Sequence, residues 1–101
     1  MNTLVRIKRC ALANRLRLTI KAREELEADD LDIEDIRESL VNARTIFKSI
    51  RSTNPFTHKR ELLHIIHSPN LSGLMIYTKG KLVVEQRTET FYLLISSKRL
   101  T

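Results

Sequence analysis

The sequence feature that most constrains the fold is a pattern of two strands and a turn in Arg60–Lys81, RELLHIIHSPNLSGLMIYTKGK. Two apolar runs rich in β-forming residues flank the segment SPNLSG, in which Pro69 and Gly73 stand among small polar residues. Such a cluster marks a turn between two strands, so the pattern predicts a β-hairpin. We take its loop as 69–72, closed by Ser68 opposite Gly73.

This register decides which side chains meet across the hairpin. It sets His64 opposite Tyr77 and Leu62 opposite Lys79. Directly opposed residues share one face of a sheet, close enough for their side chains to touch. We therefore expect a histidine, a tyrosine and a lysine on one surface. Imidazole titrates near neutrality and can transfer protons, so His64 is a candidate catalytic residue. The alternative is a sheet histidine that is hydrogen-bonded for structural reasons.

Three helices are predicted in the first part of the chain, over 2–14, 20–28 and 33–43. Thr19 and Asp32 precede the second and third helices as N-caps, because their side-chain oxygens can accept hydrogen bonds from free backbone N–H groups of the first turn. The apolar residues at helical spacing that we expect to face the core are Leu4, Ile7, Ala11, Ala22, Leu26, Ile33, Ile36 and Leu40.

Strands dominate the rest of the chain. Residues 45–52 alternate in a β-rich pattern, and 91–97 is the most hydrophobic run, which indicates a buried central strand. The segment between the hairpin and 91–97 either extends the second hairpin strand to about Gln86 or forms a separate short strand. Helices first and strands later indicate one α+β domain over 1–101, with the helices packed on one face of a small antiparallel sheet.

The net charge of +6 is unevenly distributed. Residues 1–23 carry seven basic and no acidic residues, whereas 24–38 carry nine of the twelve acidic residues. Residues 39–101 hold ten basic and three acidic residues. If the acidic segment occupies one side, the remaining surface attracts polyanions through counterion release. A soluble basic protein with no such partner is the alternative.

Several classes of function are disfavoured by what the sequence lacks. A single cysteine, Cys10, cannot form an internal disulfide, and no apolar run approaches the roughly 20 residues of a membrane span, so we expect a cytoplasmic protein. His64 and His67 are an odd number of residues apart and point to opposite faces of a strand, which argues against a metal site. A helix-turn-helix over 19–43 would have an acidic recognition helix, which phosphates repel.

Five short motifs follow one another from about Thr19 to Arg99. They are TIKA (19–22) with LDIEDI (31–36), IFKSI (46–50), LLHIIHSP (62–69), GLMIYTK (73–79) and LISSK (94–98). Their order and spacing resemble the MqsR-like toxins, part of the wider RelE-like group of small bacterial proteins that cleave messenger RNA. The chain is also similar to a neighbouring uncharacterised domain family of the same superfamily.

The resemblance implies a set of catalytic residues. The lysine of the family's F-x-K-S motif falls on Lys48, its active-site tyrosine on Tyr77 and its C-terminal catalytic lysine on Lys98. The family's glutamine falls on His64, a departure that supplies a better proton shuttle. In a second departure, the aspartate–tyrosine pair after that glutamine is replaced by Ile65 and His67, with Ile66 between them. In a third, the interval from Tyr77 to Lys98 is longer than the family's by several residues.

The activity implied by the resemblance is that of a metal-independent endoribonuclease, an mRNA interferase without a cofactor. A ribose 2′-hydroxyl attacks the adjacent phosphodiester, while cations stabilise the developing charge. Arg51, Lys79 and Arg99 would hold the RNA backbone. The expected partners are messenger RNA, a cognate antitoxin protein of a type II toxin–antitoxin system and, where cleavage depends on it, the ribosome. The alternative is a catalytically inactive RNA-binding or protein-interaction module of the same fold, whose acidic segment could dock a basic partner.

Overall fold

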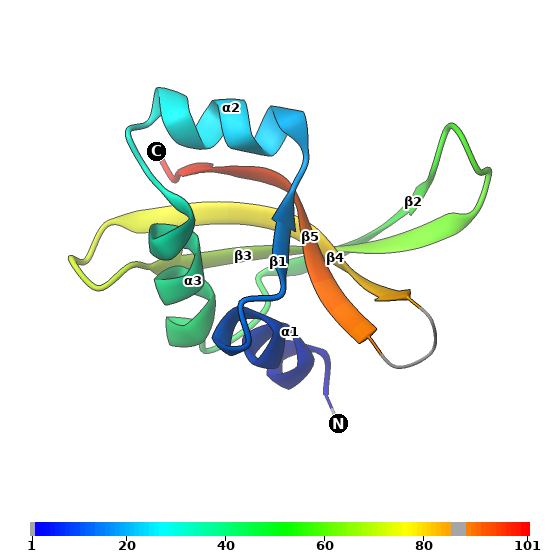
Figure 1. The fold of residues 1–101 in the computed structure, drawn as a ribbon, viewed down its shortest axis with the longest axis horizontal. Helices are drawn as coiled ribbons and strands as arrows, with labels where there is room; N and C mark the ends of the chain where they lie inside the picture. The colour runs from blue at the N-terminus through cyan, green and yellow to red at the C-terminus, as the bar shows by residue number, and fades with distance from the viewer. Residues whose placement is uncertain (1, 86–88) are drawn as a thin grey trace.

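The structure, a computed structural model, describes residues 2–85 and 89–101, which form an α+β fold (Figure 1). Its helices are α1 (Thr3–Leu12), α2 (Ile20–Ala28) and α3 (Ile33–Asn42). Its strands, in chain order, are β1 (Leu16–Leu18), β2 (Lys48–Thr53), β3 (Arg60–Pro69), β4 (Met75–Glu85) and β5 (Glu89–Arg99). In the described ranges, every helix is too short and too polar to traverse a bilayer.

The five described strands form one sheet in the order β1-β5-β4-β3-β2. The expectation of a purely antiparallel sheet was wrong, because β1 pairs with β5 in parallel through Leu16–Leu18. Three residues are too few to show a strand period in the sequence, and their partner lies at the far end of the chain. The run 91–97 lies in β5, a largely buried strand flanked by β1 and β4, as predicted, while the middle position of the sheet belongs to β4. The segment after the hairpin extends the second hairpin strand, which was one of the two predicted alternatives, since β4 continues to Glu85.

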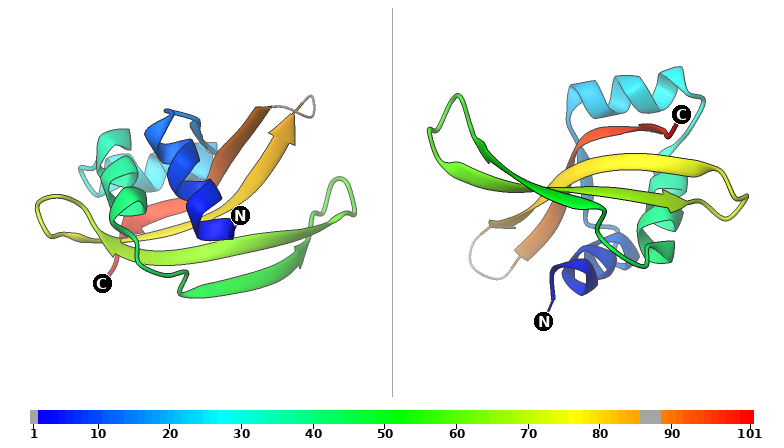
Figure 2. Two further views of the ribbon diagram at one scale, coloured as in Figure 1. Left: turned by 90° about the horizontal axis from the view of Figure 1, so that it is seen from below. Right: turned by 180° about the vertical axis from the view of Figure 1, so that it is seen from behind.

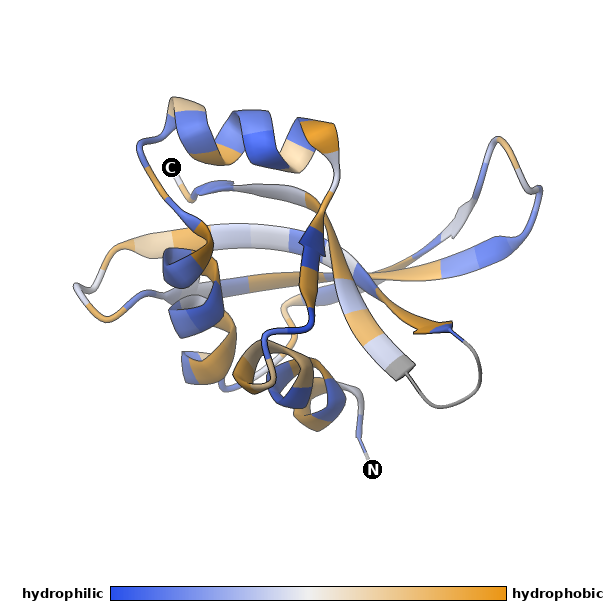
Figure 3. Cartoon of the chain, in the orientation of Figure 1, coloured by the Kyte–Doolittle hydropathy of each residue, from blue (hydrophilic) through white to orange (hydrophobic). Residues whose placement is uncertain are grey.

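The three helices lie on one side of the sheet and leave its opposite face uncovered (Figure 2). The helices contribute Ile7, Ala11, Ala22, Leu26, Ile36 and Leu40 to the core, and the strands contribute Ile66, Ile76, Tyr92 and Leu94. Figure 3 shows the matching pattern, with hydrophobic and hydrophilic residues alternating along α1 and α3. The prediction of Ile33 as a core residue was wrong: it begins α3 with 42% of its surface exposed, and the buried stripe starts one turn later.

Side-chain caps fix where two of the helices begin, as predicted. Thr19 Oγ1 accepts a hydrogen bond from the backbone N–H of Ala22 at 3.1 Å. Asp32 Oδ1 accepts from the backbone N–H of Asp35, and the Asp35 carboxylate accepts from the N–H of Asp32. This reciprocal capping box satisfies two backbone donors at the start of α3. Some of the acidic segment 24–38 is therefore explained by helix capping.

The predicted hairpin is present, but its register differs from the predicted one. Its loop is 70–74, and β3 pairs with β4 so that His67 lies opposite Tyr77, and His64 opposite Gly80. Gly73 has a φ of +87°, a left-handed conformation that glycine adopts readily and that belongs in the turn rather than in a strand pair. The pairing is shifted by three residues, and an odd shift turns the paired side chains to opposite faces.

Helix α3 holds this turn in place from the covered side of the sheet. Asn70 Nδ2 donates to Asp35 Oδ1 at 3.0 Å, and the backbone N–H of Leu71 donates to Glu38 Oε1 at 2.9 Å. Deeper in the core, Ser39 Oγ donates to the carbonyl oxygen of Ser68 at 2.8 Å. These contacts come from a helix about 30 residues earlier in the chain, so the turn sequence alone did not reveal them.

Candidate nucleic-acid interface

One row of side chains crosses three strands on the uncovered face. His67 of β3 lies opposite Tyr77 of β4, which lies opposite Lys98 of β5. The rings of His67 and Tyr77 have centroids 5.6 Å apart at an interplanar angle of 40°. Lys98 Nζ is 5.5 Å from the centroid of the Tyr77 ring, within the range of a cation–π contact. An imidazole, a phenol and an ammonium group thus stand side by side.

A second row runs parallel to the first, two residues away along β3 and β4. Lys48 of β2 lies opposite Ile65 of β3, which lies opposite Lys79 of β4. Because residues two apart in a strand share a face, Lys79 is on the same side as Tyr77. Four of the predicted site residues therefore share the uncovered face: Lys48, Tyr77, Lys79 and Lys98.

Phe47 adds a further ring to this face. It directly precedes β2 with 63% of its surface exposed, and it stacks on His67 with centroids 4.1 Å apart and an interplanar angle of 23°. We call Phe47, Lys48, His67, Tyr77, Lys79 and Lys98 the open-face cluster. Sequence reasoning missed Phe47 and His67. The signal that could have found His67 is the glycine in the turn, because a loop of 70–74 puts His67, not His64, opposite Tyr77.

His64 does not belong to the open-face cluster, so the expectation that it faces Tyr77 was wrong. It shares a strand face with Ile66, which is fully buried under the helices, and only 4% of its own surface is exposed. Its Nδ1 atom is 2.9 Å from Ser49 Oγ, the residue opposite it on β2. Burial lowers the pKa of His64, because an apolar surrounding disfavours the imidazolium. These are the features of a structural histidine.

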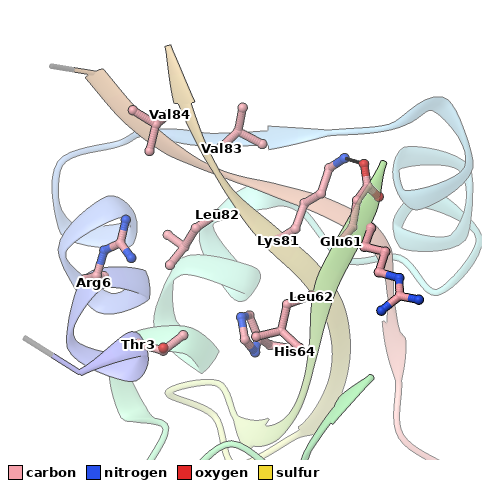
Figure 4. A pocket seen from close by; sticks show the side chains of 10 residues that line it. Thr3, Arg6, Glu61, Leu62, His64, Lys81, Leu82, Val83 and Val84 are labelled. Carbon is pink, nitrogen blue, oxygen red and sulfur yellow. Dashed lines mark hydrogen bonds and ion pairs between the residues drawn. The ribbon is translucent and has the colours of Figure 1, made fainter. Parts of the chain in front are cut away.

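A hollow lies beside His64 where β3 and β4 separate, since their pairing begins only at His64 and Gly80. Figure 4 shows it between α1, which contributes Arg6, and the two diverging strands. Lys81 Nζ and Glu61 Oε1 form an ion pair at 2.5 Å across the opening. Glu61 neutralises Lys81, so the cationic residues that remain in the lining of this hollow are Arg6 and Arg60.

Arg51 and Arg99, two of the predicted RNA contacts, also lie away from the open-face cluster. Arg51 is opposite Leu62, on the side of the sheet that His64 occupies. Arg99 is opposite the buried Ile76, and its backbone N–H donates to Asp29 Oδ2 at 2.8 Å. Alternation along a strand places them there, because each is an odd number of residues from a lysine of the cluster.

A hollow of about 430 Å³ borders the open-face cluster next to His67. The loop from α3 to β2 and the end of β3 form its walls: Asn42, Arg44, Thr45, His67, Ser68 and Pro69. Its size is in the range of pockets that hold small ligands. The guanidinium of Arg44 gives it a positive charge, and a guanidinium can bind phosphate oxygens or a carboxylate with two parallel hydrogen bonds.

The electrostatic surroundings of the cluster are mainly positive. Lys98 forms an ion pair with Glu25 of α2, whose Oε2 atom is 3.9 Å from Lys98 Nζ. The carboxylate of Glu25 also accepts a hydrogen bond from Ser96, whose Oγ donates to Oε1 at 2.7 Å. Within the described part of the chain, no three His, Cys, Asp or Glu side chains gather as a metal site would require. The arrangement therefore offers cations and stacking rings to a ligand.

No family model matches the chain, and comparisons with curated proteins and with solved structures find no match either.

Proposed function

We propose that the protein binds single-stranded RNA on the open-face cluster and cleaves it there, as the toxin of a type II toxin–antitoxin pair. The observation that carries this proposal is the grouping of three lysines with three rings on the uncovered face: Lys48, Lys79 and Lys98 with Phe47, His67 and Tyr77. The order of sequence motifs that resembles the MqsR-like toxins supports it independently.

The cluster suits single-stranded RNA for two physical reasons. Lysines neutralise phosphates and release the counterions condensed on them, which drives association. Unpaired bases stack on aromatic side chains with about 1–3 kcal/mol each, and an exposed sheet face is a common platform for this. Phe47, which is largely exposed, is the ring best placed to receive a base. A double helix would hide its bases from these rings.

The same groups suit cleavage without a metal ion. In the proposed reaction the ribose 2′-oxygen forms a bond to phosphorus, the bond to the 5′-oxygen breaks, and the products are a 2′,3′-cyclic phosphate and a 5′-hydroxyl. Lys48 and Lys98 stabilise the charge that develops on the phosphorane oxygens, a contribution that is often the largest in catalysis. The phenol of Tyr77 donates the proton that the departing 5′-oxygen requires.

The test is to incubate purified protein with end-labelled single-stranded RNA in excess EDTA, with and without ribosomes. Wild-type protein should yield fragments with cyclic phosphate ends, and Lys98→Ala should lower the rate at least about 100-fold, the scale for removing one group that stabilises transition-state charge. The matched control is Lys59→Ala, which replaces an exposed lysine of the β2–β3 loop and should cleave at the wild-type rate. Intact RNA under both conditions with folded protein would exclude the enzyme.

Neutralisation by a partner is a separate part of the proposal. A small protein encoded next to this chain should restore growth when the two are co-expressed, and should block RNA binding by covering the open-face cluster. The acidic segment 24–38 is less suited to docking a partner, because Glu25, Asp29, Asp35 and Glu38 already accept intramolecular hydrogen bonds. Growth inhibition that persists with every adjacent small protein would contradict the toxin–antitoxin assignment.

A second candidate is an RNA-binding module without catalysis. The observation that favours it is the burial of His64, the imidazole at the position of the family's glutamine. In this case RNA affinity would fall steeply with salt, and no fragments would form under any condition. Cleavage by the wild-type protein that is abolished in Lys98→Ala separates the two candidates.

A further inference from the structure

The open-face cluster contains an imidazole that neither the motif resemblance nor the predicted register assigned to a site. His67 is partly buried, and its ring lies between Phe47, stacked at 4.1 Å, and Tyr77, tilted at 5.6 Å. Contacts on both sides restrict the rotation of the ring. Within residues 2–85 and 89–101, its nitrogens have no hydrogen-bond partner, and it lines the hollow that contains Arg44. It is therefore an oriented imidazole that remains accessible to a ligand.

We propose that His67 is the general base of the cleavage reaction and that the hollow beside it holds the nucleotide on one side of the scissile phosphate. This inference rests on the proposed function. Neutral His67 accepts the proton of the 2′-hydroxyl as the bond from the 2′-oxygen to phosphorus forms. Tyr77 gives its phenolic proton to the 5′-oxygen as that bond to phosphorus breaks. The imidazolium then returns a proton to the phenolate through solvent, so both residues regain their starting states.

The neighbouring charges fit this assignment. Tyr77 of β4 lies beside His67, with Lys98 of β5 near its ring, and the adjacent row of the same face adds Lys48 and Lys79. Arg44, from the loop before β2, lines the same hollow as His67. Phe47, which covers the other side of the ring, has no charge. Arg44 can bind the phosphate or base of the nucleotide in the hollow.

The deciding experiment compares three variants in the EDTA cleavage assay, each with one histidine replaced. His67→Gln should lower the cleavage rate about 100-fold or more, the usual range for removal of a general base. RNA affinity and melting temperature should stay close to those of the wild type. His58→Gln, in the exposed β2–β3 loop, is the matched control. His64→Gln tests the competing histidine and should keep most of the cleavage rate when folded.

Two further readouts separate a catalytic role from a structural one. The rate should rise with pH in the wild type, because only an unprotonated imidazole can accept a proton, and this rise should vanish in His67→Gln. Free imidazole in the buffer should restore part of the activity of His67→Gly and none of that of Lys98→Ala. Arg44→Ala should raise KM more than it lowers kcat, because it removes a binding group.

The outcomes distinguish this inference from the function on which it rests. If the wild type cleaves RNA and His67→Gln cleaves equally with the same pH profile, His67 is not the base and the inference is overturned. Cleavage that disappears only in His64→Gln would overturn it in favour of the buried histidine. If the wild type leaves RNA intact, the proposed function fails, and the role of His67 fails with it.

Discussion

The two faces of the sheet are built from the same strands but have opposite properties. On the face under the helices, Ile66, Ile76, Thr78 and Leu94 are fully buried. On the other face, His67, Tyr77, Lys79 and Lys98 are not buried, and the buried positions among them are Ile65 and Ser96. Side chains alternate along a strand, so one residue of register decides whether a group packs in the core or lies on the uncovered face.

His64 and His67 show this difference most directly. They lie on one strand, three residues apart, and therefore on opposite faces. His64 is hydrogen-bonded to Ser49 and is nearly inaccessible to solvent. His67 stacks on Phe47 and borders an open hollow. The comparison teaches that a histidine's chemical role follows from its face and neighbours, not from its place in a motif.

The largest expected effect is on the covered face. Ile66→Ala removes a fully buried side chain from the centre of the sheet and leaves a cavity. We therefore expect the free energy of unfolding to fall by about 2–5 kcal/mol. Ile20→Ala is the matched control, because Ile20 is 78% exposed and its truncation should cost little. Urea unfolding followed by circular dichroism measures both. Equal stabilities of the two variants would contradict the assignment of the faces.

Gly80→Ala probes how closely the covered face is packed. A Cβ at this position would lie 2.7 Å from the carbonyl oxygen of Leu93 and from the ring of Tyr92. Because Tyr92 is fully buried, its ring has little room to move, and we expect a destabilisation of about 1–3 kcal/mol from overpacking. Thermal melting checks this. In a Tyr92→Leu background the added destabilisation should shrink, and an unchanged value would show that the ring is not the obstacle.

Basic residues of the two faces should contribute differently to RNA binding. Removing Lys48 or Lys98 should reduce the dependence of log affinity on log salt concentration by about 0.7 for each phosphate of a single strand that is no longer neutralised. Arg51→Ala, on the opposite side of the sheet, should leave this slope unchanged. Fluorescence anisotropy with a labelled oligoribonucleotide at several salt concentrations measures the slope. An equal reduction in Arg51→Ala would argue for binding that is not confined to one face.

The smallest expected effect concerns pH and His64. Burial lowers the pKa of its folded form, so the unfolded state binds more protons when pH falls through about 6.5, the ordinary value for histidine. Its contribution to stability is complete above that pH and is lost below it, with a slope of at most about 1.4 kcal/mol per pH unit. Urea unfolding at pH 7.5 and 5.5 should show a smaller difference for His64→Gln than for the wild type. His58→Gln, which changes an exposed residue, should behave like the wild type.

Much of the fold follows from local patterns in the sequence. The helices begin after Thr19 and Asp32 as expected, because a capping side chain acts within one turn of the backbone that it satisfies. The hairpin was predictable for the same reason, since proline fixes its own φ and glycine permits the positive φ that the turn needs, both of which are local effects. Parallel β1 was not, because the strand with which it pairs is β5, which lies more than 70 residues away.

The candidate site was predictable only in part. Lys48, Tyr77, Lys79 and Lys98 were identified from motifs and strand patterns, and the structure places them on one face. The histidine that accompanies them was predicted to be His64 instead of His67, because the turn was taken as four residues. The contacts from α3 that hold the turn are distant in sequence.

The sequence by itself determined the three described helices and their limits to within about two residues, four of the five described strands, the net positive charge and four residues of the candidate site. These properties depend on neighbouring residues and on composition. Only the tertiary structure decided the register of the hairpin and, with it, that His67 rather than His64 stands beside Tyr77. The physical reason is that α3, packed across the chain, holds the turn through Asp35 and Glu38, and an odd shift of a strand exchanges its two faces.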